Sequence, residues 1–367
     1  MREEKSEEKT VRNASIEWLR IAMMLMIITL HYFYQGGILE SVTTDEGIYY
    51  YGVWLLEALC MISVNVYVLI SGYYLLEGKF RLKKVVFLAL EVWIYSVSIY
   101  LIACLVGWER FNINSVLTSY FFPVIKGKWW FITDYIVMYL LYPILNVGIK
   151  NLTREQHKFL IGLLFILFSL IPKVVFFSAD QLGVNQGYSL LWFLALYVTG
   201  AYIRRYEISI TKTKLILIFC GMIFFTALVK FMQIHIIGKE YFNLYSYNSP
   251  TVYAASACLF LGVVKFCRGG ALPSIARSIA KSTFGVFIIH THDSVREWLW
   301  NDVIRPSNHI GNVGYLLLSV VCIYIACTGI DYIRRLIFKP MENNGKFNNL
   351  IVCLEKKWFS IYRRESR

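Results

Sequence analysis

Two ionisable side chains, Arg20 and His31, lie within the first apolar stretch of the chain. At about 100° per residue their spacing is three helical turns plus about 20°, so a helix would carry both on one face, about 16 Å apart. A guanidinium binds phosphate oxygens, and an imidazole exchanges a proton near neutral pH. One helical stripe can therefore supply an anion-binding group and a general base. The alternative is that Arg20 extends to lipid phosphates and that His31 only hydrogen-bonds a neighbouring helix.

Other ionisable side chains also lie within apolar stretches, where each is costly unless it faces protein or water. Glu57 is at about the depth of His31 and can orient its imidazole, although it can also pair with Lys230. Asp134 is a rival partner for His31. A single histidine such as His290, in the middle of an apolar helix, is commonly a packing contact. The remaining members of this group are Glu91, His235, His292 and Asp293.

The composition requires these residues to be positioned by membrane-spanning helices. Of the 367 residues, 57% are apolar and only 17% are charged, whereas a soluble domain has about 25% charged residues. Because lipid offers no hydrogen-bond partner to the backbone, the long apolar stretches must be helical. The fold class is therefore an all-α polytopic membrane protein of about ten spans. They are 15–35, 49–76, 84–106, 129–149, 157–177, 187–203, 213–237, 250–267, 279–300 and 312–338.

Charge placement predicts the orientation of these spans. Lys and Arg are concentrated in alternate connecting segments beginning with the amino end, so we expect both termini to be cytoplasmic. The chain then divides into a cytoplasmic leader (1–14), a ten-helix domain (15–338) and a basic amphipathic tail (339–367). The tail can lie on the anionic inner leaflet or against the cytoplasmic loops. The net charge of +13 thus points to lipid and not to nucleic acid.

Four segments, in order along nearly the whole chain, resemble the signature of acyltransferase family 3. Lys128 departs from this signature, because relatives often carry histidine at its position, two residues before the tryptophan that is Trp130 here. The segments are EWLRIA at 17–22 continuing to His31, VYVLISGY at 66–73, WWFI at 129–132 continuing to YLLYP at 139–143, and STFGVFIIH at 282–290.

This resemblance implies a ten-helix acyltransferase in the plasma membrane of a bacterium. It would move an acetyl or other short acyl group from cytoplasmic acyl-CoA, acting as co-substrate, to a hydroxyl of a cell-surface polysaccharide or lipid-linked sugar. His31 would be the base, assisted by Glu57, and Arg20 and Ser71 would bind the acyl donor. The candidate acceptor-site residues are Trp130, Tyr139, Asp134 and His290.

Several of these residues have simpler explanations, and other functions are compatible with the pattern. Ser71-Gly72 can serve close helix packing, and Trp130 can belong to an interfacial aromatic belt. A transporter or flippase of a lipid-linked glycan also needs buried charges, and a sensor or scaffold would use them only for stability. The eight cysteines form no disulfide framework or metal-ligand spacing, so we expect no permanently bound cofactor or metal. The oligomeric state stays open.

Overall fold

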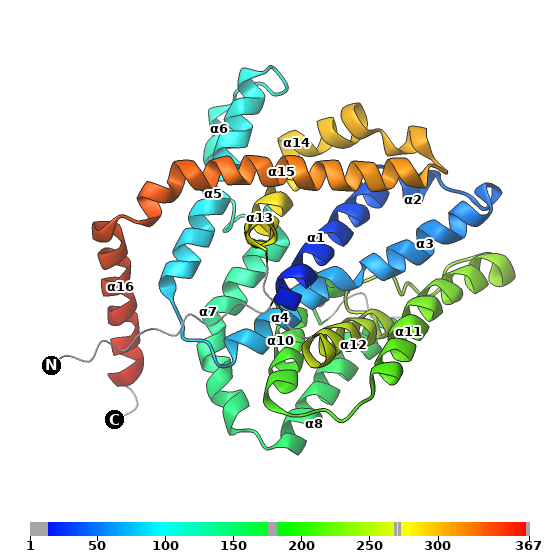
Figure 1. The fold of residues 1–367 in the computed structure, drawn as a ribbon, viewed down its shortest axis with the longest axis horizontal. Helices are drawn as coiled ribbons and strands as arrows, with labels where there is room; N and C mark the ends of the chain where they lie inside the picture. The colour runs from blue at the N-terminus through cyan, green and yellow to red at the C-terminus, as the bar shows by residue number, and fades with distance from the viewer. Residues whose placement is uncertain (1–13, 175–181, 268–269, 271–272, 365–367) are drawn as a thin grey trace.

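The computed structural model describes residues 14–174, 182–267, 270 and 273–364, and within these ranges the regular structure is helical, without strands (Figure 1). Each of the ten predicted spans overlaps a helix, and residues 175–177 of the span 157–177 lie outside the described residues, as do 1–13 of the predicted leader and 365–367 of the predicted tail. The principal helices are α1 (Ala14–Tyr34), α3 (Ile48–Cys60), α4 (Ile62–Leu75), α5 (Leu82–Leu105), α7 (Trp130–Asn151), α8 (Arg154–Phe165), α10 (Leu190–Arg205), α11 (Lys212–Met232), α12 (Pro250–Phe266), α13 (Ser274–Thr291), α15 (Val313–Glu342) and α16 (Gly345–Arg364).

Seven helical segments within the described residues are long and apolar enough to cross a bilayer, with α3 and α4 joined through Met61 as one of them. The other three predicted spans are the shorter helices α10 and α12 and the more polar α13. These three pack against several other helices, α10 and α12 on α4, and α13 on α1 and α15. A helix enclosed by protein need not match the bilayer in length or apolarity. This explains why these three helices are shorter or more polar than a lipid-exposed span.

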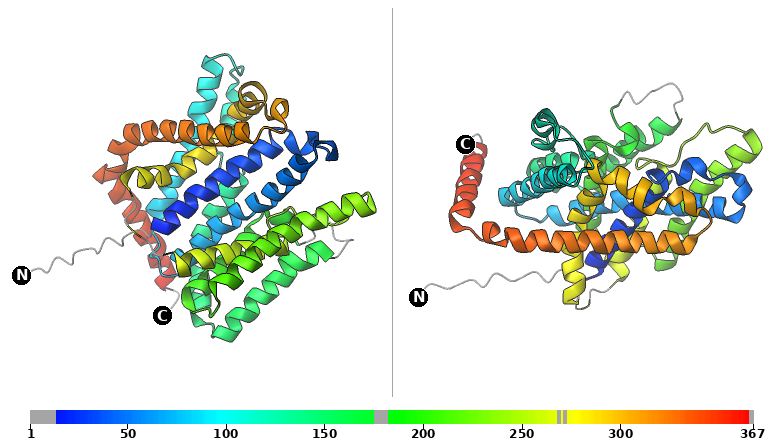
Figure 2. Two further views of the ribbon diagram at one scale, coloured as in Figure 1. Left: turned by 45° about the vertical axis from the view of Figure 1, so that its right-hand side comes forward. Right: turned by 90° about the horizontal axis from the view of Figure 1, so that it is seen from above.

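Helix α1 occupies the middle of the bundle, as the views of Figure 2 show, and packs against α3, α4, α12, α13 and α15. Its side chains are accordingly buried on several faces, including Met23, Ile28, Tyr32 and Phe33, each at most 1% exposed. The helix that carries Arg20 and His31 is therefore shielded from lipid over much of its surface.

The contact between α4 and α10 depends on two glycines. A Cβ atom placed on Gly72 would lie 2.3 Å from the Tyr197 carbonyl oxygen, and one on Gly200 would lie 2.4 Å from the Leu69 carbonyl oxygen. Either substitution would force the helices apart, because such distances are far inside van der Waals contact. The small-residue packing considered for Ser71-Gly72 is thus observed at Gly72.

The ninth predicted span, 279–300, is interrupted. Helix α13 ends at Thr291, and His292 adopts an extended backbone as the N-cap of α14 (Asp293–Glu297). The His292 Nδ1 atom accepts a hydrogen bond from the Ser294 N–H at 3.2 Å, and Nε2 donates to the Ser96 carbonyl at 3.1 Å. Hydropathy alone misses this break, because the helix restarts after a single capping residue.

The tail forms helix α16, which turns at a steep angle away from α15 (Figure 1). It packs on the start of α5, where Glu355 Oε2 accepts a hydrogen bond from the Leu82 N–H at 2.9 Å and Phe347 contacts Phe87. Ile351 is 2% exposed at this contact, whereas Leu350 and Leu354 stay half or more exposed. One face of the tail helix therefore docks on the bundle and another faces outward.

Candidate active site

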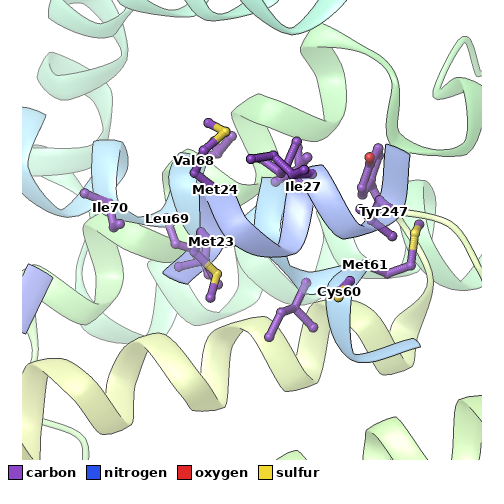
Figure 3. Close-up of a cluster of buried hydrophobic side chains, with 14 of the residues drawn as sticks. Met23, Met24, Ile27, Cys60, Met61, Val68, Leu69, Ile70 and Tyr247 are labelled. Atoms are coloured by element: carbon purple, nitrogen blue, oxygen red, sulfur yellow. The ribbon is translucent and has the colours of Figure 1, made fainter. Parts of the chain in front are cut away.

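A single cavity of about 740 Å³ contains most of the predicted functional residues. It is lined by side chains from α1, α3, α4, α7 and α13, and by the segment that connects α11 to α12. Met24 and Ile27 line its middle, and Figure 3 shows them on one side of α1 with Met23 on the other. Arg20 and His31 line the same cavity, as their shared helical face predicts.

After the predicted orientation of the spans, we call the end of the cavity at His31 its outer part and the end at Arg20 its inner part. At the outer part, His31 is hydrogen-bonded to His290. The His31 Nδ1 atom lies 2.8 Å from His290 Nε2, and the His290 Nδ1 atom lies 2.5 Å from the carbonyl oxygen of Val286. A carbonyl oxygen only accepts, so His290 must carry its hydrogen on Nδ1 and accept on Nε2. His31 then donates from Nδ1, which leaves its Nε2 lone pair unprotonated.

This arrangement provides a basic nitrogen at the cavity wall. No other hydrogen bond of the His31 imidazole is found among the described residues, and the imidazole lines the cavity. His290 itself is fully buried and lies behind His31 instead of lining the cavity. The second histidine therefore fixes the tautomer and orientation of the first, in the manner of an orienting residue behind a general base.

Arg20 and Ser71 line the inner part of the cavity, where the sequence placed them together. The Arg20 guanidinium contacts Glu17 at 3.4 Å and its side chain is 32% exposed, so most of its donors stay available. Tyr67 connects the two residues, because its hydroxyl donates to the Arg20 carbonyl at 2.6 Å and its own carbonyl accepts from Ser71 Oγ at 3.1 Å. The inner part of the cavity thus presents a cation and a hydroxyl.

Glu57 lines the cavity but forms neither of the contacts predicted for it. His31 bonds His290, and Lys230 forms an ion pair with Glu240 while its ammonium lies 3.6 Å from the centre of the Trp54 ring. Glu57 is 6% exposed as a residue, and its carboxylate Oε2 atom has no hydrogen-bond partner among the described residues. An acidic group at this depth is therefore present without a partner.

Three further residues that the sequence predicted for the site lie on one helix, but only one of them lines the cavity. Trp130 lines the cavity, whereas Tyr139 and Asp134 do not, although both belong to the same helix α7. Tyr139 packs on Phe80 and Tyr142. Lys128, the departure from the family pattern, lies outside the cavity lining, with its ammonium 3.2 Å from Asp293.

The sequence analysis missed the segment between α11 and α12. Its backbone is fixed by Gln233, which accepts from the N–H groups of Tyr241 and Phe242, and by Asn65, which donates to the Tyr247 carbonyl at 2.8 Å. Tyr245 and Tyr247 line the cavity from this segment. Scanning for ionisable residues could not find it, but the density of tyrosine and asparagine over 241–248 was a usable signal.

The helical bundle defines a multi-pass membrane protein with a cavity between its helices, and a histidine ring lines this cavity. The family model described as the acyltransferase domain matches residues 13–331. The chain therefore belongs to acyltransferase family 3, and family membership implies transferase activity. Neither the comparison with curated proteins nor that with solved structures found a match.

Proposed function

We propose that this protein transfers an acetyl or other short acyl group from cytoplasmic acyl-CoA to a hydroxyl of a cell-surface polysaccharide or lipid-linked sugar. The observation that carries the proposal is one cavity lined at its inner part by Arg20 and at its outer part by the unprotonated Nε2 of His31. Family membership supports acyl transfer as the reaction class.

The donor would enter from the cytoplasmic side. Arg20 offers a cation to the phosphates or the thioester arm, and Ser71 offers a hydroxyl to the same arm. Along α1 about 16 Å separate Arg20 from His31, so the thioester end must extend outward through the middle of the cavity. Its apolar lining by Met24 and Ile27 would keep water from hydrolysing the thioester.

The acceptor would approach His31 from the outer part of the cavity. Its hydroxyl oxygen attacks the thioester carbonyl carbon, the proton passes to His31 Nε2, and the carbon–sulfur bond breaks to release coenzyme A. A positioned general base contributes about 10²- to 10⁴-fold to such a step. His290 acts on this step indirectly, because it holds His31 in the tautomer that leaves Nε2 free.

The test is release of free coenzyme A by the purified protein in nanodiscs with acetyl-CoA and a hydroxylated glycan fraction, followed by mass spectrometry. We expect His31→Ala to lower this release about 10²-fold or more while leaving membrane insertion intact. His235→Ala is the matched control, since that histidine bonds Tyr51 and lies outside the cavity lining. Full activity in His31→Ala would refute the proposal, and glycan transport without coenzyme A release would favour a flippase.

A further inference from the structure

The outer part of the cavity has a lining unlike that of the inner part. We define the outer lobe by six of its residues: Gln35, Glu57, Trp130, Lys230, Tyr245 and Tyr247. The lobe combines aromatic rings with polar groups at membrane depth. A site with this mixture fits a ligand that has both apolar faces and hydrogen-bonding groups.

Two oxygen atoms of the outer lobe have no hydrogen-bond partner among the described residues. They are Oε2 of Glu57 and Oε1 of Gln35, and both are shielded from solvent. Gln35 follows His31 by one helical turn, and its N–H donates to the His31 carbonyl at 2.8 Å. Leaving buried acceptors unpaired is costly, so this pattern points to a ligand that supplies donors close to the base.

The charge balance of the lobe disfavours an anionic ligand. Lys230 is the basic side chain among the six residues, and it already pairs with Glu240 and lies against the Trp54 ring. Glu57 adds an acidic group without a compensating cation. No free positive charge in the lobe would receive a carboxylate or phosphate of a ligand.

Aromatic side chains that line the same cavity supply flat surfaces. The Trp130 and Tyr247 rings stack at 5.9 Å with an interplanar angle of 27°, and Tyr245 meets Trp54 at 5.2 Å. Rigid rings of this kind bind the apolar face of a sugar ring while its hydroxyls point to polar neighbours.

We infer that the outer lobe binds an uncharged, hydroxyl-rich ring of the acceptor, whose hydroxyls donate to Glu57 and Gln35. The inference rests on the proposed function, since it names the acceptor class of the same cavity. It gives Glu57 a role in binding the acceptor in place of the role in orienting His31 that the sequence predicted. The acceptor class is a neutral pyranose, and uronic acids are excluded.

The test uses the full chain in nanodiscs and three probes: methyl glucopyranoside, its anionic uronate, and its 2-amino analogue. Binding is measured by saturation-transfer NMR without donor, and turnover by coenzyme A release from acetyl-CoA. The wild type should bind the neutral glycoside and not the uronate. Glu57→Gln should raise the KM for the neutral glycoside about tenfold, with the kcat, its pH profile and the KM for acetyl-CoA unchanged.

Two further variants keep the result interpretable. Asp134→Asn is the matched control, because this carboxyl on α7 lies outside the cavity lining and should leave binding unchanged. Gln35→Ala tests the second oxygen if Glu57→Gln yields too little folded protein, and it should also weaken glycoside binding.

Three outcomes would overturn the inference. They are a loss of kcat in Glu57→Gln with the glycoside KM unchanged, binding of the uronate as strong as that of the neutral probe, and absence of glycoside binding to the wild type. Failure of the proposed function alone would look different, because glycoside binding would persist and depend on Glu57 while no coenzyme A was released.

Discussion

Helix α13 contributes to two buried polar clusters that differ in how completely their groups are paired. Near its middle, Ser282 and Gly285 meet a cluster on α5 and α15, which we call the Asp331 network. At its outer end, His290 meets His31. The Asp331 network consists of Glu91, Tyr95, Asp331, Arg334 and Arg335.

Every charged group of the Asp331 network has an ion-pair partner of opposite charge. Asp331 is fully buried, and its Oδ1 accepts hydrogen bonds from Tyr95 Oη at 2.7 Å and from Arg334 at 2.8 Å. Its Oδ2 forms an ion pair with Arg335 Nε at 3.0 Å that lacks hydrogen-bond geometry, and Arg334 also pairs with Glu91 at 2.8 Å. None of these residues lines the cavity. The network thus gives Glu91, which the sequence left without a role, a structural one in joining α5, α13 and α15.

The histidine pair is open by contrast, because His31 keeps one ring nitrogen unpaired at the cavity wall. The comparison teaches that burial of charge does not by itself identify a reactive site. A cluster whose charges are paired with one another and that lies away from the cavity holds helices together, whereas a cluster with an unpaired group at the cavity wall is available to a substrate. Three substitutions test this distinction, in addition to those at His31 and Glu57.

The largest expected effect is on stability, from Asp331→Ala. Removing the shared, fully buried carboxylate leaves two partly buried guanidinium groups with fewer partners, which costs about 3–5 kcal/mol in the free energy of unfolding. Thermal unfolding in detergent should show a strongly lowered midpoint and a reduced yield. Asp302→Ala, at an exposed aspartate, is the control and should unfold like the wild type. An unchanged midpoint in Asp331→Ala would remove the structural role of the network.

The next effect is on catalysis, from His290→Ala. Without its acceptor, His31 is free to adopt the other tautomer, and we expect coenzyme A release to fall about 10- to 100-fold, as for other residues that orient a reactive group. The KM for acyl-CoA should not change. His290→Gln should recover part of the activity, because its side-chain carbonyl can accept from His31 Nδ1. Equal losses in both variants would mean that His290 serves packing only.

The smallest effect is expected from Gly285→Ala, which changes the space beside the Asp331 network without removing any charge. A Cβ atom at this position would lie 2.5 Å from Asp331 Oδ1, so the carboxylate must move, at a cost of about 1–3 kcal/mol. Gly329→Ala on α15 has no heavy atom within 4 Å and should be neutral or slightly stabilising. Similar unfolding midpoints for the two variants would contradict the tight contact between α13 and the Asp331 network.

The sequence predicted the relative positions of residues on a single helix, and it did not predict contacts that depend on how several helices pack. Arg20 and His31 share the cavity because both lie on a single α-helix with fixed periodicity. The partner of His31 could not be found in this way. Glu57 and His290 lie on helices α3 and α13, which both pack on α1, and the rotation of each helix about its axis decides which of them reaches the imidazole.

Hydropathy also predicted the spans better than the connections. Each of the ten predicted spans overlaps a helix of the described residues, including the short α10 and α12, because their composition is apolar even where their length is small. Hydropathy could not place the segment 241–248 at the cavity, since a polar irregular chain reads as an external loop. Asn65 and Gln233 anchor that segment, and neither residue is ionisable.

The Val286 carbonyl ends the hydrogen-bond chain that runs from His31 through His290, and this determines the route by which a proton can leave the site. A carbonyl oxygen cannot pass a proton on. In the proposed reaction, the proton that His31 Nε2 takes from the acceptor hydroxyl therefore cannot leave through His290. It must depart through the nitrogen by which it came, and the sulfur of the outgoing coenzyme A is the natural recipient. Each cycle would then be electrically neutral, and the enzyme would acylate sugars without drawing on the membrane potential.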